Sequence, residues 1–345
     1  MNVKIPSLGP PLPLLITGIA GVAGYGAMEF FRGLFGEKVI GIRQADNWPL
    51  TGPGIVACDA EDRERLSALF AEHQFAAVLN CAGNCALKKC ELDPAMANRI
   101  NVEGVENLLH VISEQAHEVR LVHLSIDLVY SGTRGGSHAE HDFTDPVTHY
   151  GKTMVEAEQA VLTNQPDAAI LRISLPMGVS FNGHAGAIDW IQSRYMKDKP
   201  ATLYFDEVRT PAYVDCLNRV FATMLAGDMA GIYHAGGPRR LSLFQIAQIV
   251  NRVGGYDPDL LQGCYRRDAG PMPPRAGNVT MDSSRLAEVL GYQPFDPWPV
   301  CEEFVPTDPL WHYRRDEGQP GSPDLLARVL YRNPSFAEDV SAMRD

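Results

Sequence analysis

A glycine-rich turn, more than any other feature, constrains what this 345-residue chain can fold into. In LLITGIAGVAGYGA, an apolar run ends at Thr17, glycines follow as Gly18, Gly21 and Gly24, and a helical pattern starts at Val22. Glycine permits a tight turn with positive φ and lets backbone approach a bound anion, and a helix N-terminus supplies free N–H groups. The turn predicts a strand-to-helix connection that cradles a pyrophosphate, although its GxxGxxG spacing differs from the usual GxGxxG.

The first half of the chain alternates short apolar runs with helical periods. The apolar runs that indicate buried strands are LPLLI, KVIGI, GIVAC, AAVLNC and RLVHLS, and helical stretches such as DRERLSALFAEH lie between them. Such alternation indicates a parallel sheet covered by helices on both faces. The expected fold class is α/β, a Rossmann-type doubly wound parallel sheet with a smaller α/β substrate-binding lobe.

The rhythm of strands and helices changes twice along the chain. After AAILRIS it breaks into Pro- and Gly-rich loops with isolated helices, and from Trp298 the chain becomes rich in Pro and charged residues. We expect a dinucleotide-binding Rossmann domain (12–173 with 206–234), a substrate-binding lobe (174–205 with 235–297) and a C-terminal extension (298–345). The extension is expected to be an appended tail with little core of its own.

Composition excludes several classes of protein. The formal charge of −12 argues against a nucleic-acid groove, which needs clustered Lys and Arg. No apolar run reaches the roughly 18 residues of a membrane span. We expect a soluble cytoplasmic protein with a small-molecule partner and no nucleic-acid or membrane partner, and a homodimer is left open.

The cysteines and histidines do not indicate a disulfide framework or a metal site. Seven cysteines are an odd number in a large domain. The cluster Cys81, Cys85 and Cys90, and His138 and His141 in HAEH, lack the ligand spacing of a zinc site. No metal is expected.

The end of the second predicted strand bears on the choice of cofactor. In GIRQ, Arg43 stands where an acidic residue would hold the ribose hydroxyls of NADH. A guanidinium suits a 2′-phosphate, so we expect NADPH in preference to NADH, with NAD as the alternative. Arg43 could equally solvate a strand end. Asp59 could accept a hydrogen bond from the adenine amine or cap the next helix.

With NCAG at 80–83 and Asn101 in the following helix, the chain resembles the extended short-chain dehydrogenase/reductases. Within them it is similar to dTDP-4-dehydrorhamnose reductases and to the regulatory β subunits of methionine adenosyltransferase. The similarity continues through LSIDLVYSGTRGG, DPVTHYGKT, AAILRIS, DEVRTPAYVDCLN, GIYHAGGP and DSSRLAEVLGYQP, over about residues 12–297. It implies a cofactor site formed by Thr17, Gly18, Gly21, Val22, Gly24, Arg43, Asp59, Cys81, Ala82, Gly83, Asn101 and Tyr150.

The resemblance also implies a catalytic Ser/Thr, Tyr and Lys. The Tyr gives a proton to the substrate carbonyl as hydride arrives, the Lys binds the nicotinamide ribose and lowers the Tyr pKa, and the hydroxyl positions the carbonyl oxygen. Tyr150 matches the tyrosine, but the hydroxyl position falls on Ile126, with Ser125 one residue earlier, and the lysine position on Met154. Leu175 stands where rhamnose-forming reductases place a substrate-stacking tryptophan.

Neighbouring residues do not replace the missing groups convincingly. Lys152 is about 200° around the helix from Tyr150 and should face away, and Ser125 alternates to the opposite side of a regular strand. An ammonium about 5 Å from the phenol, at an effective dielectric constant near 20, is worth on the order of 3 kcal/mol, or about two pKa units. Its loss should slow proton transfer by about two orders of magnitude.

Two charged residues keep positions that related enzymes use for substrate. Asp127 lies where the reductases contact the sugar, and Arg209 lies where related enzymes meet the substrate diphosphate. The leading hypothesis is an NAD(P)H-dependent reductase of a nucleotide-sugar-like substrate, with Tyr150, Asp127 and Ser125 as catalytic candidates and degenerate positions at Ile126 and Met154. The alternatives are a catalytically degenerate NADP-binding regulatory or ligand-binding protein, and a non-redox dehydratase or epimerase.

Overall fold

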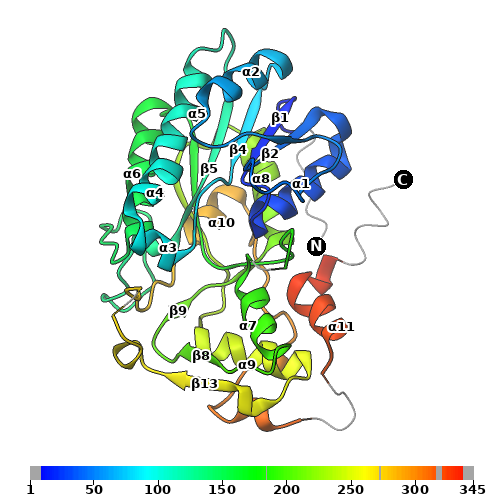
Figure 1. Cartoon of the computed structure of the whole chain (residues 1–345), viewed down its shortest axis with the longest axis vertical. Coiled ribbons are helices and arrows are strands. Elements are labelled where there is room, and N and C mark those ends of the chain that lie inside the picture. The colour runs from blue at the N-terminus through cyan, green and yellow to red at the C-terminus, as the bar shows by residue number, and fades with distance from the viewer. Residues whose placement is uncertain (1–8, 184, 272, 316–320, 337–345) are drawn as a thin grey trace.

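The computed structural model describes residues 9–183, 185–271, 273–315 and 321–336, and its frame is a seven-stranded sheet (Figure 1). The strand order is β11-β6-β5-β4-β1-β2-β3, and every pairing is parallel. The strands are β1 (Leu14–Thr17), β2 (Val39–Arg43), β3 (Ile55–Ala57), β4 (Ala77–Asn80), β5 (Arg120–Ile126), β6 (Ala169–Ile173) and β11 (Gly231–Ala235). The order reverses between β1 and β4, where sheets of this kind bind ligands, and the predicted Rossmann-type fold is confirmed.

Helices cover both faces of the sheet. They are α1 (Val22–Phe35), α2 (Arg63–His73), α3 (Leu87–Leu92), α4 (Pro94–Asn98), α5 (Gly104–Ser113), α6 (His149–Asn164), α8 (Val214–Ala226) and α10 (Ser284–Leu290). Side chains alternate along β1, so Leu14 and Ile16 join the core beneath α1 and α8, and Leu15 joins the core beneath α2, α5 and α6. None of the described helices is long and apolar enough to cross a membrane.

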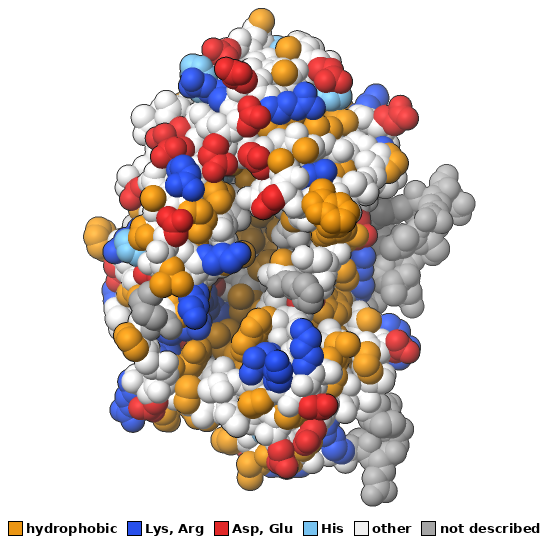
Figure 2. All heavy atoms as spheres, in the orientation of Figure 1, with side chains coloured by type: hydrophobic (Ala, Val, Ile, Leu, Met, Phe, Trp, Pro, Cys, Tyr) orange, Lys and Arg blue, Asp and Glu red, His pale blue; other side chains and the backbone are white. Residues whose placement is uncertain are grey.

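A smaller lobe lies below the sheet domain in Figure 1 and contains α7 (Ala187–Tyr195) and α9 (Leu243–Gly254). Beside them, β8 (Ala201–Tyr204) and β13 (Leu261–Cys264) form a parallel pair. Short pairings join β7 (Pro176–Met177) to β10 (Ala212–Tyr213) and β9 (Val208–Arg209) to β12 (Leu241–Ser242). Figure 2 shows a hollow between the sheet domain and this lobe.

The predicted domain boundaries place α10 in the lobe, but α10 packs on β11 at the edge of the sheet. Arg285 Nη1 of α10 donates a hydrogen bond to the carbonyl oxygen of Ile232 in β11 over 3.1 Å. The segment after β11 therefore returns to the sheet domain once it has built α9 and β13.

The described part of the C-terminal extension packs into the shared core, contrary to the expectation of an appended tail. Trp298 is fully buried, and Leu326 of α11 (Pro323–Leu326) and Leu330 belong to the same apolar cluster as β1, α8 and α9. The Trp298 Nε1 atom donates to the carbonyl oxygen of Leu330 over 2.9 Å. Buried aromatic surface of this size is a large contribution to the core.

Polar contacts join the same extension to both parts of the molecule. The Tyr331 hydroxyl donates to Asp189 Oδ1 on α7 over 2.5 Å. Arg332 pairs with Glu29 on α1 at 3.1 Å and with Asp215 on α8 at 3.3 Å. The extension thus links a lobe helix to two helices of the sheet domain.

Candidate functional site at the carboxyl edge of the sheet

The glycine turn lies between β1 and α1, and its three glycines serve different needs. Gly18 has φ +64°, and a Cβ there would lie 2.3 Å from the carbonyl oxygen of Cys81. A Cβ on Gly24 would lie 2.3 Å from the carbonyl oxygen of Gly18. A Cβ on Gly21, whose φ is −79°, would meet only the Gly18 carbonyl oxygen, at an ordinary 3.6 Å. Packing within the protein therefore requires Gly18 and Gly24 but would tolerate a Cβ at Gly21.

The start of α1 supplies the donors that an anion needs. Gly21 is the N-cap and makes no side-chain hydrogen bond, and the first turn of α1, which begins at Val22, has no acidic residue. A helix of 14 residues with an uncapped N-terminus offers N–H groups and positive dipole to a phosphate. A glycine at position 21 that packing does not require, together with these donors, fits a pyrophosphate.

A web of buried polar groups fixes the neighbouring turn after β4. The Thr17 hydroxyl donates to Asn80 Oδ1 over 2.5 Å and accepts from the Ala82 N–H over 3.0 Å. Asn80 Nδ2 lies 2.9 Å from His123 Nδ1, and burial lowers the pKa of His123 to about 4, so its neutral ring accepts this bond. Thr17 therefore positions the turn that carries Cys81 and Ala82, and its hydroxyl is already occupied.

Asn101 holds the next part of the same loop. It lies in a π-helical turn, Arg99–Glu103, between α4 and α5 and is 1% exposed. Its Oδ1 accepts from the Asn84 N–H over 2.7 Å, and its Nδ2 donates to the Thr153 hydroxyl over 3.0 Å. Gly83 is exposed beside it, and a Cβ there would lie 3.5 Å from Asn101 Oδ1. Asn101 thus ties the loop after β4 to α6.

Arg43 and Asp59 both hold the turn that follows β2. Arg43 Nη1 donates to the carbonyl oxygens of Gln44 and Ala45 over 2.8 and 3.1 Å. Asp59 Oδ1 accepts from the Ala45 N–H over 2.8 Å. The guanidinium thus lies at the end of β2, the position from which the sequence predicts contact with a 2′-phosphate. That contact remains a prediction.

Tyr150 and Met154 lie on one face of α6, as the helical period predicts. Thr148 caps the helix, and its hydroxyl accepts from the Gly151 N–H over 2.9 Å. Tyr150 and Met154 are 7% and 4% exposed, whereas Lys152 is exposed on the opposite side. The prediction that Lys152 faces away from Tyr150 is confirmed.

The surroundings of Tyr150 disfavour its ionised form. Burial, together with the Cys85 thiol and the Asp127 carboxylate, raises the pKa of Tyr150 well above its ordinary value. Tyr150 and Met154 share a buried apolar cluster with Cys90, Ala97, Leu128, Val129, Tyr130, Ala276, Val279 and Met281. The Arg209 guanidinium acts in the opposite direction on the pKa of Tyr150 but does not outweigh burial. Ile126 is half-buried and packs against this cluster. Tyr150 is therefore a firmly protonated phenol in an apolar setting.

Ser125 does not supply the missing hydroxyl. Its Oγ donates to Glu158 Oε1 over 2.5 Å, and Ser125 is 2% exposed. Glu158 is in turn paired with Arg172 Nη2 at 2.6 Å. The regular alternation of β5 continues to this residue and turns Ser125 towards α6 and away from the reacting side of Tyr150, so Ser125 is withdrawn as a catalytic candidate.

Arg209 and Asp127, which the sequence predicts to contact substrate, are paired with each other in the structure. Arg209 Nη1 donates to Asp127 Oδ1 over 2.6 Å, and Arg209 Nη2 donates to Glu207 Oε1 over 2.7 Å. The Ser174 hydroxyl donates to Asp127 Oδ2 over 2.6 Å. Arg209 is 3% exposed and Asp127 is fully buried, so neither side chain presents appreciable surface to a ligand in this arrangement.

The carboxylates keep this guanidinium charged. Burial by itself would lower the pKa of Arg209, but Asp127 and Glu207 outweigh burial and raise that pKa above its ordinary value. Asp127, Arg209 and Glu207 form a line of charges, and a second cation, Arg275, continues it. Arg275 Nη1 lies 4.0 Å from Glu207 Oε2. The Arg275 side chain is 26% exposed and its guanidinium lies 4.8 Å from the centre of the Tyr204 ring. Arg275 is therefore better placed than Arg209 to meet an anionic ligand, and chain spacing gave no sign of this.

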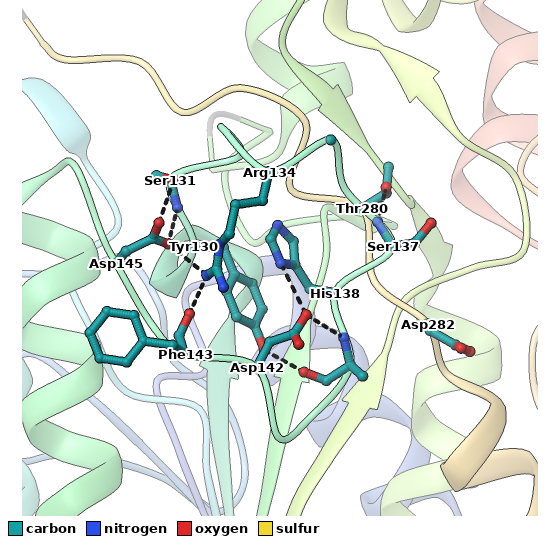
Figure 3. Close-up of polar contacts among 12 residues, drawn as sticks. Tyr130, Ser131, Arg134, Ser137, His138, Asp142, Phe143, Asp145, Thr280 and Asp282 are labelled. Atoms are coloured by element: carbon teal, nitrogen blue, oxygen red, sulfur yellow. Dashed lines mark hydrogen bonds and ion pairs between the residues drawn. The ribbon is translucent and has the colours of Figure 1, made fainter.

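The loop between β5 and α6 is held tightly at the margin of the site (Figure 3). The rings of Tyr130 and His138 stack with centres 4.0 Å apart and planes 5° apart, and His138 Nδ1 lies 3.4 Å from Asp142 Oδ2. The Ser131 N–H and hydroxyl both donate to Asp145. His138 of the HAEH stretch thus serves in packing, and the described residues contain no cluster of three His, Cys, Asp or Glu suited to a metal ion.

Comparisons with known proteins agree with this architecture. The sequence profile described as "RmlD substrate binding domain" matches residues 25–300. A protein of Streptomyces antibioticus named probable dTDP-4,6-dihydroxy-2-methyloxan-3-one 4-ketoreductase is 30% identical over 275 residues, 75% of this chain and 84% of that protein. Methionine adenosyltransferase 2 subunit beta of Xenopus laevis is 24% identical over 293 residues, 81% of this chain and 83% of that protein. The crystal structure of dTDP-4-dehydrorhamnose reductase from Bacillus anthracis in complex with NADP superposes with a TM-score of 0.70 at 19% identity, over 83% of this chain and 95% of that chain.

Proposed function

The chain belongs to the RmlD substrate binding domain family, and from that premise we propose that it is a nicotinamide-dependent reductase of a nucleotide-sugar-like carbonyl compound. One observation carries the proposal. The glycine turn, in which no packing contact within the protein requires a glycine at position 21, and Tyr150 at the start of α6 both lie at the carboxyl edge of the same sheet. A dinucleotide on the turn and a carbonyl at Tyr150 would meet there.

The cofactor half of the site supports NADPH as the preferred dinucleotide. The uncapped start of α1 would bind the pyrophosphate, and Arg43 at the end of β2 would bind the adenosine 2′-phosphate. A bound nicotinamide dinucleotide supplies hydride to a carbonyl. Fixed by Thr17 and Asn101, the turn after β4 would form the wall of the nicotinamide side.

The proton half of the site is reduced to one group. Tyr150 would donate a proton to the oxygen of the substrate carbonyl, and its raised pKa makes this donation slow. Met154 provides no ammonium to lower that pKa, and Ile126 provides no hydroxyl to orient the carbonyl. We therefore infer a reductase whose proton transfer is about two orders of magnitude slower than that of a site with the lysine.

The nucleotide end of the substrate would lie towards the lobe. A diphosphate needs a guanidinium with free donors, and Arg275 meets this need because its side chain is partly exposed. Arg266, which is paired with Asp206 at 3.1 Å, lies in the preceding segment and adds positive charge. These residues replace Arg209 in our assignment of the substrate site.

The experiment that tests the proposal measures NADPH oxidation with dTDP-4-keto-6-deoxyhexoses, in the parent protein and in Tyr150→Phe. We expect slow turnover in the parent and none in the variant, with NADPH affinity unchanged. Turnover that persists in Tyr150→Phe would show that Tyr150 is not the proton donor. The absence of NADPH binding by the parent protein would overturn the proposal.

A second candidate is a binding or regulatory protein that holds the dinucleotide without turning it over. The observation that favours it is the combination at Tyr150 of a raised pKa and an apolar residue one turn further on. The similarity to methionine adenosyltransferase 2 subunit beta supports this class. A parent protein that binds NADPH, shows no activity and gains none from Met154→Lys with Ile126→Thr would favour it over the reductase.

A dehydratase or epimerase is less well supported. Such chemistry would need Asp127 to exchange a proton with the substrate. Both oxygens of Asp127 accept hydrogen bonds within the protein, from Arg209 and Ser174, and the residue is fully buried. We therefore do not propose it.

A further inference from the structure

Half-buried apolar residues line the carboxyl ends of four neighbouring strands. Ala20 follows β1, Cys81 follows β4, Ile126 ends β5, and Leu175 follows β6. All four pack with one side against the main core and keep part of their surface exposed. Figure 2 shows apolar side chains inside the hollow and Lys and Arg side chains at its margins. A ligand that reaches this edge meets a largely apolar wall.

The polar residues of the same edge are already satisfied within the protein. Thr17 bonds to Asn80, Ser125 to Glu158, and Asp127 to both Ser174 and Arg209. None of these residues is more than 3% exposed. Their side chains therefore present almost no accessible surface to the hydroxyl groups of a ligand.

Three polar atoms near this edge have no hydrogen-bond partner among the described residues, and none of them is accessible. They are Arg209 Nε, Glu207 Oε2 and Thr210 Oγ1, each with almost no exposed surface. Tyr150 differs from all of these residues, because its hydroxyl makes no hydrogen bond within the described part of the chain while its ring is 7% exposed. One donor is thus left for one acceptor, which in the proposed function is the carbonyl oxygen.

We infer that the reactive end of the substrate is a deoxygenated carbonyl compound, in which the carbons next to the carbonyl carry hydrogen or methyl in place of hydroxyl groups. This inference rests on the proposed function and names its substrate class. A hydroxyl placed against Ile126 or Leu175 would lose its bonds to water and find no partner. An apolar wall discriminates against an added hydroxyl by roughly ten- to one-hundred-fold.

The opposite end of the same ligand is expected to be polar. Arg275 is partly exposed beyond Glu207, and Tyr204 lies beneath its guanidinium. The line of charges from Asp127 through Arg209 and Glu207 leads from the apolar edge to this cation. A nucleoside diphosphate attached to a deoxygenated sugar matches both ends.

The experiment compares two dTDP-4-keto-6-deoxyhexoses that differ only in whether carbon 3, next to the carbonyl, carries a hydroxyl group. Both are assayed for NADPH oxidation and, with NADP⁺ present, for binding by calorimetry. We expect the deoxygenated compound to be preferred by about tenfold or more in kcat/KM and in affinity. Equal values, or a preference for the hydroxylated compound, would overturn the inference.

Two variants of Ile126 isolate the wall itself. Valine and threonine have the same shape, so Ile126→Val and Ile126→Thr both lose one methylene but only the second adds a hydroxyl. We expect Ile126→Val to keep the preference and Ile126→Thr to reduce it by about tenfold. An equal effect of both changes would overturn the role of Ile126. Should Ile126→Thr fail to fold, Leu175→Thr beside Leu175→Val makes the same comparison.

The two proposals fail in different ways. Binding that prefers the deoxygenated compound, with no turnover of either, would overturn the reductase and support the inference. Turnover of both compounds at equal kcat/KM would support the reductase and overturn the inference. A protein that neither binds nor reduces either compound would overturn both.

Discussion

Arg209 Nη1 lies 2.6 Å from Asp127 Oδ1, in an ion pair whose side chains are 4% and 0% exposed. The two residues are 82 positions apart in sequence, and the pair joins the end of β5 to β9 of the lobe. A buried pair of this kind constrains geometry strongly, because each charge depends on the other for solvation. The pair thus holds the end of β5 against β9, and a role of either residue in ligand contact stays a prediction.

The first prediction concerns the stability of this pair. Arg209→Met should destabilise the protein by about 3–5 kcal/mol, since it leaves Asp127 buried without a cation and Glu207 with only Arg275, 4.0 Å away. Arg267→Met is the matched control, because the Arg267 side chain is 82% exposed, and it should change stability by less than about 0.5 kcal/mol. Urea unfolding of both variants measures the difference. Equal free energies of unfolding in the two variants would show that the buried pair does not stabilise the fold.

The second prediction concerns the lost ammonium. Met154→Lys should raise turnover by about tenfold or more, because a cation one turn from Tyr150 lowers its pKa. Ile126→Thr should add to the gain by donating to the carbonyl oxygen. Met154→Leu serves as the control, and because it adds no charge it should leave turnover unchanged. Stopped-flow measurement of NADPH oxidation, with folding checked by circular dichroism, separates a rescued site from a damaged one, and no gain from the double variant would count against the reductase.

A third prediction distinguishes the glycine that is needed for ligand binding from the glycine that is needed for packing within the turn. Gly21→Ala should fold normally and lose dinucleotide affinity, because its Cβ meets only an ordinary 3.6 Å contact within the protein. Gly24→Ala should lower the thermal midpoint even without ligand, because its Cβ would lie 2.3 Å from the Gly18 carbonyl oxygen. Thermal unfolding with and without NADPH distinguishes the two. The same NADPH-induced shift in Gly21→Ala as in the parent would exclude Gly21 from the anion site.

The choice between the two dinucleotides gives a fourth prediction. Arg43→Ala should weaken NADPH binding by about tenfold and leave NADH binding nearly unchanged, because only NADPH carries the 2′-phosphate. Arg63→Ala, in the first turn of α2, serves as a control for general loss of positive charge. Calorimetric titration of each variant with both cofactors measures the effect. Equal losses for NADPH and NADH would assign Arg43 to the fold of its turn alone.

The fifth prediction is a pH dependence of stability. Burial lowers the pKa of His123 to about 4, below the ordinary value near 6.5 that it regains on unfolding. Between these two values the unfolded chain binds more protons than the folded one, so stability falls as the pH drops from about 6.5 to about 4. His123→Gln keeps an acceptor for Asn80 and should make this slope shallower by up to about 1.4 kcal/mol per pH unit. His110→Gln, on a half-exposed histidine, should leave the slope unchanged, and equal slopes in all three proteins would contradict the assignment.

Local patterns in the sequence were enough to predict the sheet and the turn. The β-branched runs gave five of the strands of the parallel sheet because buried parallel strands are continuous apolar segments. The helical period placed Tyr150 and Met154 on one face and Lys152 on the other. This prediction was possible because all three residues lie within one helix.

The partners of buried charges could not be predicted in this way. Ser125 reaches Glu158 across 33 residues, and Arg209 reaches Asp127 across 82. Which carboxylate neutralises which cation depends on the relative position of separate elements, and no spacing in the chain encodes it. The packing of the C-terminal extension could not be predicted from its composition either. Its few buried apolar residues, such as Trp298, are separated by polar segments.

The position of Trp298, Leu326 and Leu330 in the shared core has a consequence for the order in which the protein can mature. A ribosome delivers β1 and α1 roughly three hundred residues before it delivers Leu326 and Leu330, at about 5–20 residues per second. Synthesis of those three hundred residues takes on the order of tens of seconds, and throughout it the apolar surface of β1 and α1 lacks the cover that Leu326 and Leu330 provide. Since exposed apolar surface favours aggregation in such intermediates, the yield of folded protein should depend on these late residues as strongly as on the sheet itself.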